Sequence, residues 1–382
     1  MKEFQDKVEG IRKHLSIKNI YGISISLQQN FAWLTCGGRN YVGTHTEKGI
    51  ATIYVDALNV ILITNNIEAN RIISEELGNC GEVTKLQEHQ TNQIQLIEYD
   101  WYGPALSTKA LLFKNKVIKS EQVNIESDED PIASAILSTL RCKLNKFEID
   151  RYKLLGRDCG ALIAKVAKHH IRRGVSESEL TSKVAEECYK LNIVPVVILI
   201  ASDERVDNFR HPIPHFSKCV QNKVMLVLCG RRYGLIASVT RMVHIGPIPS
   251  ELRAKHDAVC YVDAVAMSMT KVGNNGSKIF ERIKHAYEEK NFGGEWKLHH
   301  QGGQTGYMSR EWKACDGDSH QILAESAFAW NPSITGTKSE DTIVINGDGE
   351  CEIITESEEW PTLNVTVDNC VYKRADILQV VE

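Results

Sequence analysis

The stretch Val224-Met-Leu-Val-Leu-Cys-Gly-Arg-Arg-Tyr-Gly-Leu-Ile-Ala-Ser-Val-Thr-Arg241 contains two apolar runs, Val224–Cys229 and Leu235–Val239, around a tight glycine-bounded connection. Apolar runs of this length with glycine between them are typical of paired strands. We therefore predict a hairpin here. A nearly continuous apolar run at Val194–Ala201 predicts a further buried strand just upstream.

Helical patterns flank this hairpin on both sides. Apolar residues recur at helical spacing from Phe147 to Arg173, which predicts a long amphipathic helix stopped by Gly174. Ser176 and Glu179 have the spacing of a capping box and predict a second helix to about Leu191. Further helical signals cover Ser250–Met267 and Lys278–Glu289, and the tail from Ala327 to Val380 is rich in strand and turn signals.

The first third of the chain alternates between helix and strand patterns. The expected helices are Phe4–Leu15 and Ala69–Leu77, and the expected strands are Tyr21–Leu27, Ala51–Tyr54 and Val60–Thr64. This alternation predicts a small α/β domain. The acidic stretch Ser120–Pro131 has no apolar periodicity and ends in proline, so we interpret it as a linker between domains 1–130 and 131–382.

The amino-acid composition excludes some classes of function. The chain has 382 residues, of which 42% are hydrophobic and 25% charged, with a formal net charge of -4. It shows no basic stripe, so we expect neither a nucleic acid nor a membrane as partner. The N-terminus lacks the apolar region of a signal peptide, and eleven scattered cysteines contain no CxxC pair. We therefore expect a cytoplasmic protein with reduced thiols.

The order of several segments resembles the creatinase/prolidase/methionine aminopeptidase superfamily. The matching segments are Phe31–Thr35, Leu140–Asp150, Phe209–Pro214, the hairpin to Arg241, Leu298–Gly306 and Asn331-Pro followed by Ser339–Ile345. The resemblance implies a mixed α/β (α+β) protein with a small creatinase-like N-terminal α/β domain. It also implies a C-terminal pita-bread domain, a curved antiparallel sheet covered by helices, and usually a homodimer.

The metal-binding pattern of the superfamily is largely missing. Its metallopeptidases hold two divalent ions with two Asp, one His and two Glu. The resemblance places Leu228, Ser238, Gly303 (or Gln304) and Asn331 at the first four positions, and only Glu340 remains. Because one carboxylate cannot offset the desolvation of two ions, we expect no metal and no other cofactor.

Creatinase, the branch that hydrolyses a C–N bond without metal, resembles the chain in three places. Its catalytic histidine matches His211, its carboxylate-binding arginine matches Arg310 in Ser309-Arg-Glu311, and its late glutamate matches Glu340. A second creatinase glutamate is Thr240 here, so creatine itself is not the expected substrate. The resemblance makes His211 a proton shuttle, Arg310 the anchor of a substrate carboxylate, and Glu340 a nucleophile or binding group.

Each of these residues also has a purely structural interpretation. His211 could bond a turn, Arg310 could pair with Glu311 or Glu325, and Glu340 could pair with Arg241 of the hairpin. His299 and His300 would face opposite sides of a strand, so we expect only His300 in the site. Two further residues are candidates for substrate binding, namely Arg241 and, by analogy with an N-terminal-domain arginine of creatinase, Arg39.

Three functions follow, of which the first two are enzymatic and the third belongs to another class. The first is a metal-independent hydrolase of a C–N bond in a small carboxylate-bearing amide, amidine or guanidino compound. The second is a metallopeptidase of the Xaa-Pro dipeptidase or aminopeptidase type with unusual ligands. The third is a catalytically inactive pita-bread module that binds peptides or proteins.

Overall fold

The computed structural model describes residues 1–86 and 93–381 and divides the chain into two compact units, 1–141 and 142–382. The first unit is built on a mixed sheet with the strand order β4-β5-β3-β2-β1-β6. These strands are β1 Gly22–Leu27, β2 Lys48–Asp56, β3 Val60–Asn65, β4 Val83–Lys85, β5 Ile94–Tyr99 and β6 Ile125–Ser127. The helices are α1 Lys2–Lys18, α2 Gln28–Leu34, α3 Ala69–Arg71, α4 Thr108–Lys114 and α5 Pro131–Cys142, with a π-helical turn η1 at Ile72–Glu76.

The stretch that we interpreted as a linker instead contributes a strand, β6, to this first sheet. β6 pairs in parallel with β1, and the buried Asp128 directly after it accepts hydrogen bonds from the backbone N–H groups of Ser26 and Leu27. The Asp128 carboxylate also accepts from the side chain of Asn30 at 3.0 Å. The acidic residue therefore satisfies backbone donors at the end of β1, which a local pattern of polarity does not reveal.

The second unit contains two four-stranded sheets. One has the order β18-β9-β8-β7 and the other β10-β11-β14-β15, and all pairings are antiparallel except β18 with β9. The strands are β7 Val194–Ser202, β8 Lys223–Arg232, β9 Leu235–Ile245, β10 Gly302–Thr305, β11 Ser326–Trp330, β14 Asp341–Ile345, β15 Cys351–Ile353 and β18 Leu378–Val380. Two ribbons, β12 Ser333–Ile334 with β13 Thr337–Lys338 and β16 Thr362–Val367 with β17 Cys370–Ala375, complete the strands.

The two sheets meet where β9 approaches β14. Thr240 and Glu340 form an antiparallel bridge there. The Thr342 hydroxyl accepts from the Ser238 N–H at 2.8 Å and donates to the Ser238 carbonyl at 2.9 Å. These bonds join the sheets, and they fix Glu340 beside the hairpin of β8 and β9. Both strands of this hairpin were predicted from the sequence.

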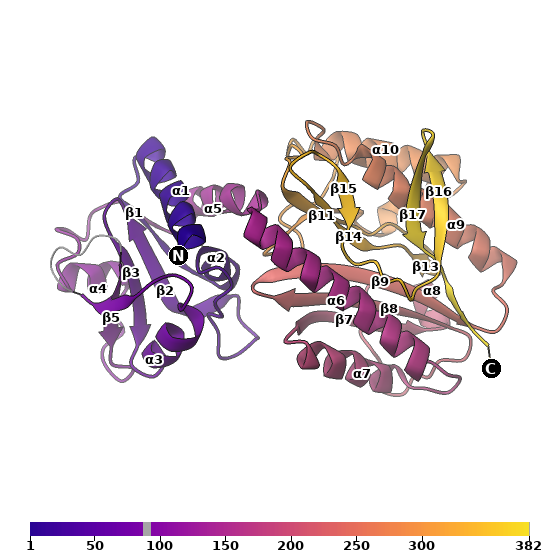
Figure 1. Cartoon of the computed structure of the whole chain (residues 1–382), viewed down its shortest axis with the longest axis horizontal. Coiled ribbons are helices and arrows are strands. Elements are labelled where there is room, and N and C mark those ends of the chain that lie inside the picture. Colours follow the sequence, from indigo (N-terminus) through magenta and orange to yellow (C-terminus); the bar gives the residue numbers. More distant parts are fainter. Residues whose placement is uncertain (87–92, 382) are drawn as a thin grey trace. The chain divides into compact units, whose positions relative to one another are not determined.

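Helices cover these sheets, as the resemblance implied. They are α6 Lys146–His170, α7 Glu177–Lys190, α8 Glu204–Asn208, α9 Ser250–Met269 and α10 Gly276–Glu289, with a 3-10 turn η2 at Glu295–Leu298. The long α6 lies across the sheet of β7, β8 and β9 (Figure 1). A reciprocal capping box of Asn145 and Glu148 begins it. Within it, Gly160 lets the helix approach the Thr355 carbonyl so closely that any side chain would collide. Among the described residues, no helix is long and apolar enough to cross a membrane.

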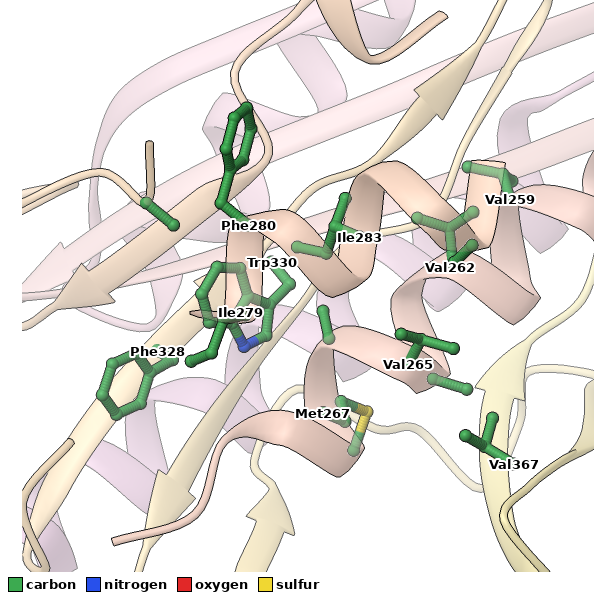
Figure 2. Packing of buried hydrophobic residues seen from close by; sticks show 14 of the residues in the cluster. Val259, Val262, Val265, Met267, Ile279, Phe280, Ile283, Phe328, Trp330 and Val367 are labelled. Atoms are coloured by element: carbon green, nitrogen blue, oxygen red, sulfur yellow. The ribbon is translucent and has the colours of Figure 1, made fainter. Parts of the chain in front are cut away.

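The core of the second unit lies between α9, α10 and β11. Figure 2 shows Val262 and Val265 of α9 and Ile283 of α10 in one cluster with Phe328 and Trp330 of β11. These side chains are almost completely buried, and burial of such residues stabilises the fold by about 1.5–3 kcal/mol each. The cluster anchors β11, and Asn331 follows this strand directly.

Candidate functional site

A buried carboxylate lies at the junction of the two sheets. Glu340 is 3% exposed, and both of its oxygens accept from cationic side chains. Oε1 is 3.1 Å from Nη2 of Arg310, and Oε2 is 2.7 Å from Nζ of Lys338 and 2.6 Å from the Thr240 hydroxyl. Burial by itself would raise the Glu340 pKa, but Lys338 and Arg310 outweigh it and lower the pKa to about 2. Glu340 is therefore ionised at neutral pH.

Two cations share this one carboxylate. The side chains of Lys338 and Arg310 are 5% and 8% exposed. Neither has a second acidic partner within ion-pair distance in the described part of the chain. The Nε–H of Arg310 is buried and has no hydrogen-bond partner among the described residues. The arrangement leaves one uncompensated positive charge and at least one unused donor, and both suit an anionic ligand.

Three histidine rings lie together in the same site. The Nε2 atoms of His299 and His211 are 3.0 Å apart, and the rings of His299 and His300 stack with centroids 4.6 Å apart. Our expectation that His299 and His300 face opposite sides of a strand is therefore wrong. That alternation holds only inside a regular strand, and these residues lie between η2 and the start of β10 at Gly302.

The histidines are held in their neutral form. Burial lowers the pKa of His299 to about 2 and that of His300 to about 3, and the neighbouring cations Lys338 and Arg310, respectively, lower them further. Burial and then Lys338 also lower the pKa of His211, whose side chain reaches solvent. The Nδ1 atoms of His299 and His300 are buried and have no hydrogen-bond partner among residues 1–86 and 93–381. Neutral imidazoles with unused nitrogens can accept a proton, bond a ligand or bind a metal.

The residues that the resemblance places at the superfamily's metal positions do not have the chemistry of a dinuclear centre. Leu228 presents a fully buried hydrocarbon side chain, and the Ser238 hydroxyl bonds the thiol of Cys229 at 3.3 Å. At Gly303 a side chain would collide with the carbonyl oxygen of Trp312, so no histidine fits there. The one remaining carboxylate, Glu340, is already bound by two cations. Two adjacent divalent ions need several free anionic ligands, and these residues do not supply them.

A different set of residues has metal-ligand geometry. The nearest ring nitrogens of His211, His299 and His300 all lie within 4.8 Å of one another, which is compatible with a single transition-metal ion. Lys338 and Arg310 act electrostatically on these same rings. Their positive charge opposes the binding of a divalent cation at this place.

The structure thus brings His211, His300, Arg310 and Glu340 into one region of the second unit. Arg241 lies elsewhere in the network: its guanidinium bonds Asp341 at 2.8 Å and the Thr355 carbonyl at 2.9 Å. Its Nη1 donates to the backbone carbonyl of Glu340 at 3.3 Å, but it forms no ion pair with the Glu340 carboxylate, the partner that we had considered for it.

Arg39 belongs to the first unit. Its side chain is 58% exposed and forms an ion pair with Glu76 at 2.9 Å. A role of Arg39 in substrate binding remains a prediction.

Sequence reasoning missed two parts of the site. The first is Lys338, whose spacing of two residues from Glu340 was the available signal, because such residues share one side of an extended chain. The second is the His299–His211 contact, for which the sequence holds no signal, since the two residues are 88 positions apart. Thr240, which we noted only as a departure from creatinase, binds Glu340.

Comparison with known proteins places the chain in a family. Residues 151–347, slightly more than half of the chain, match metallopeptidase family M24. The chain therefore belongs to metallopeptidase family M24, a family of hydrolases, and the resemblance seen in the sequence is confirmed. A comparison with curated proteins found no match.

Solved structures resemble the fold over almost the whole length of the chain. The Xaa-Pro dipeptidase from Bacillus anthracis is 16% identical, with a TM-score of 0.73 over 99% of this chain and 100% of that one. The X-Pro aminopeptidase from Thermotoga maritima is 17% identical, with a TM-score of 0.71 over 98% and 99%. The N-terminal domain of the FACT complex subunit SPT16 from chickpea (Cicer arietinum) is 11% identical, with a TM-score of 0.65 over 94% and 97%. At such identities the likeness concerns the fold alone.

Proposed function

We propose that this M24 protein is a metal-independent hydrolase of a C–N bond in a small compound that bears a carboxylate. One observation carries the proposal: Glu340 is bound by Lys338 and Arg310 beside three neutral histidines. The site thus combines cations that suit a carboxylate with imidazoles that can move a proton. In a compound with an amide, amidine or guanidino group next to a carboxylate, the carboxylate can bind the cations and the imidazoles can serve the cleavage of the C–N bond.

In the proposed reaction His211 is the general base. It is the most exposed member of the cluster, and its neutral form can take a proton from an attacking water. The water oxygen forms a bond to the substrate carbon, the C–N bond breaks, and the protonated imidazole returns its proton to the leaving nitrogen. His299 holds the His211 ring through the contact between their Nε2 atoms. In the proposed state the Nε2–H of His211 donates in this contact, which leaves Nδ1 of His211 free to take the proton.

Arg310 and Glu340 have binding roles in this proposal. The unused Nε–H of Arg310 can donate to the substrate carboxylate. Of the two roles left open for Glu340, the contacts favour the binding one, because three donors occupy its oxygens and reduce its nucleophilicity. Glu340 then orients Arg310 toward the substrate.

The Xaa-Pro peptidase alternative has direct support from the family and from the dipeptidase and aminopeptidase neighbours. In that case the three-histidine cluster, which was found among the described residues, would hold the metal ion. The binding-module alternative has support from the likeness to a subunit of the FACT complex. Metal content and turnover separate all three functions.

The test is elemental analysis of dialysed protein followed by a substrate panel of N-acyl amino acids, cyclic amidines, guanidino acids and Xaa-Pro dipeptides. We expect less than a tenth of an equivalent of Mn, Co, Zn or Fe, and turnover of a carboxylate-bearing compound that added manganese does not raise. About one metal ion per chain together with manganese-dependent cleavage of Xaa-Pro dipeptides would establish the peptidase instead. A metal-free protein without turnover of any compound would favour the binding module.

Two variants then test the roles of the residues. His211→Asn should lower kcat by about 10²–10⁴ with little change in KM, because His211 acts in proton transfer. Arg310→Ala should lower kcat/KM by about 100-fold, because the substrate carboxylate loses a charged partner. The matched control is Arg232→Ala, which removes an arginine paired with Asp158 and should leave turnover unchanged.

A further inference from the structure

Lys338 is a buried lysine in a site where the family has metal ligands. It ends the short strand β13, just after the turn at Gly336, whose φ of 97° favours glycine. Lysine is almost never fully buried unless it is paired, and the ammonium of Lys338 has its partner in Glu340 at 2.7 Å. The one surviving carboxylate of the metal pattern is thus bound by a cation that belongs to the protein itself.

The charges of this cluster do not balance. Lys338 and Arg310 contribute two positive charges, and Glu340 contributes one negative charge. A buried charge without a partner lowers the stability of a fold, so an arrangement of this kind indicates a ligand that completes it. A single negative charge on the ligand is sufficient.

Unused donors surround the same place. The ion pair with Glu340 accounts for one of the three N–H groups of Lys338, and the Arg310 Nε–H has no partner among the described residues. Ser333 lies opposite Lys338 in the β12–β13 ribbon, so the two side chains share a side. Its hydroxyl is buried and likewise unpartnered within the described residues. The ammonium and the guanidinium match the oxygens of a carboxylate, and Ser333 has an unused donor on the same side of the ribbon as Lys338.

We infer that the Lys338 ammonium takes the place of a metal cation on Glu340 and, with Arg310, binds the carboxylate of the substrate. This inference rests on the proposed function and adds the residue that selects an anionic substrate. Lys338 is then a binding residue whose charge is retained for the ligand and not for the stability of the free protein.

The test measures the binding of acetate to the full chain by thermal shift, with sodium chloride at equal ionic strength as reference. Acetate should raise the melting temperature of the wild-type protein in a saturable way. In Lys338→Met the apparent Kd for acetate should rise at least tenfold, whereas Lys338→Arg should keep most of the affinity. Lys153→Met is the matched control, because it removes a lysine from a partly exposed pair with Glu352 and should respond as the wild type does.

The melting temperature without acetate distinguishes a ligand-binding charge from a structural one. Lys338→Met leaves Arg310 and Glu340 as a neutral pair, so we expect an unchanged or higher melting temperature. The inference would be overturned if Lys338→Met melted at a clearly lower temperature than the wild type without acetate. It would also be overturned if the variant bound acetate with the Kd of the wild type. Stoichiometric metal in the wild-type protein would instead overturn the proposed function. An effect of acetate that depends on Lys338 would still support Lys338 as an anion-binding residue in that case.

Discussion

The protonation of His299 makes the stability of the second unit depend on pH. Its pKa of about 2 in the folded chain compares with an ordinary value of 6.5. Below pH 6.5 the unfolded chain takes up a proton at this residue, whereas the folded chain does not. The stability that His299 supports is thus fully present above pH 6.5 and is lost as the pH falls below it.

The magnitude follows from these two values. Between pH 7.5 and pH 5.0, protonation of an unfolded histidine with a pKa of 6.5 stabilises the unfolded chain by about 2 kcal/mol. His299→Gln removes this titration and leaves the other ionisable groups in place. The wild-type protein should therefore lose about 2 kcal/mol more free energy of unfolding than the variant over this range. Any constant effect of the substitution cancels in the comparison.

Urea denaturation at pH 7.5 and pH 5.0 is the assay. Tryptophan fluorescence reports on the second unit, because four of the six tryptophans lie there: Trp296, Trp312, Trp330 and Trp360. A difference below about 0.5 kcal/mol between wild type and variant would refute the reasoning, since it would mean that folded His299 accepts a proton near pH 5. His300 has a pKa of about 3 in the folded wild-type chain. The wild-type protein should therefore also lose more free energy of unfolding between pH 7.5 and pH 5.0 than the variant His300→Gln.

Four further outcomes are expected. Gly303→Ala should lower the free energy of unfolding by about 1–3 kcal/mol or more, because the added methyl group meets the Trp312 carbonyl, and an unchanged melting temperature would contradict the close approach. Asp128→Ala should destabilise the first unit by about 1–3 kcal/mol in urea denaturation, because it leaves buried donors without an acceptor, and a loss below about 0.5 kcal/mol would show that water replaces the carboxylate. The protein should be a homodimer by light scattering at micromolar concentration, and Arg39→Ala should slow turnover if this residue reaches the partner's site. A monomer by light scattering would contradict the predicted homodimer, and an unchanged turnover rate in Arg39→Ala would contradict the predicted role of Arg39.

Local patterns were sufficient for much of the fold. The hairpin of β8 and β9, the long helix α6 and the capped start of α7 are confirmed, because periodicity and caps act between residues close in sequence. The order of short motifs was sufficient for the superfamily, which the M24 match confirms. The interpretation of residues 120–131 as a linker was wrong because their structure depends on distant residues. Asp128 has its hydrogen-bond partners at Ser26 and Leu27, about a hundred residues away.

What the sequence determined by itself is the chemical inventory: a metal pattern reduced to Glu340, a histidine pair, and the arginines near them. The tertiary structure determined which of these residues interact. In it Glu340 forms ion pairs with Lys338 and Arg310, Arg241 forms an ion pair with Asp341, and His211 contacts His299. The physical reason is that the energy of a charged or hydrogen-bonding group depends on burial and on neighbours within a few ångströms, and the chain sets both only when β9, β13 and β14 have come together.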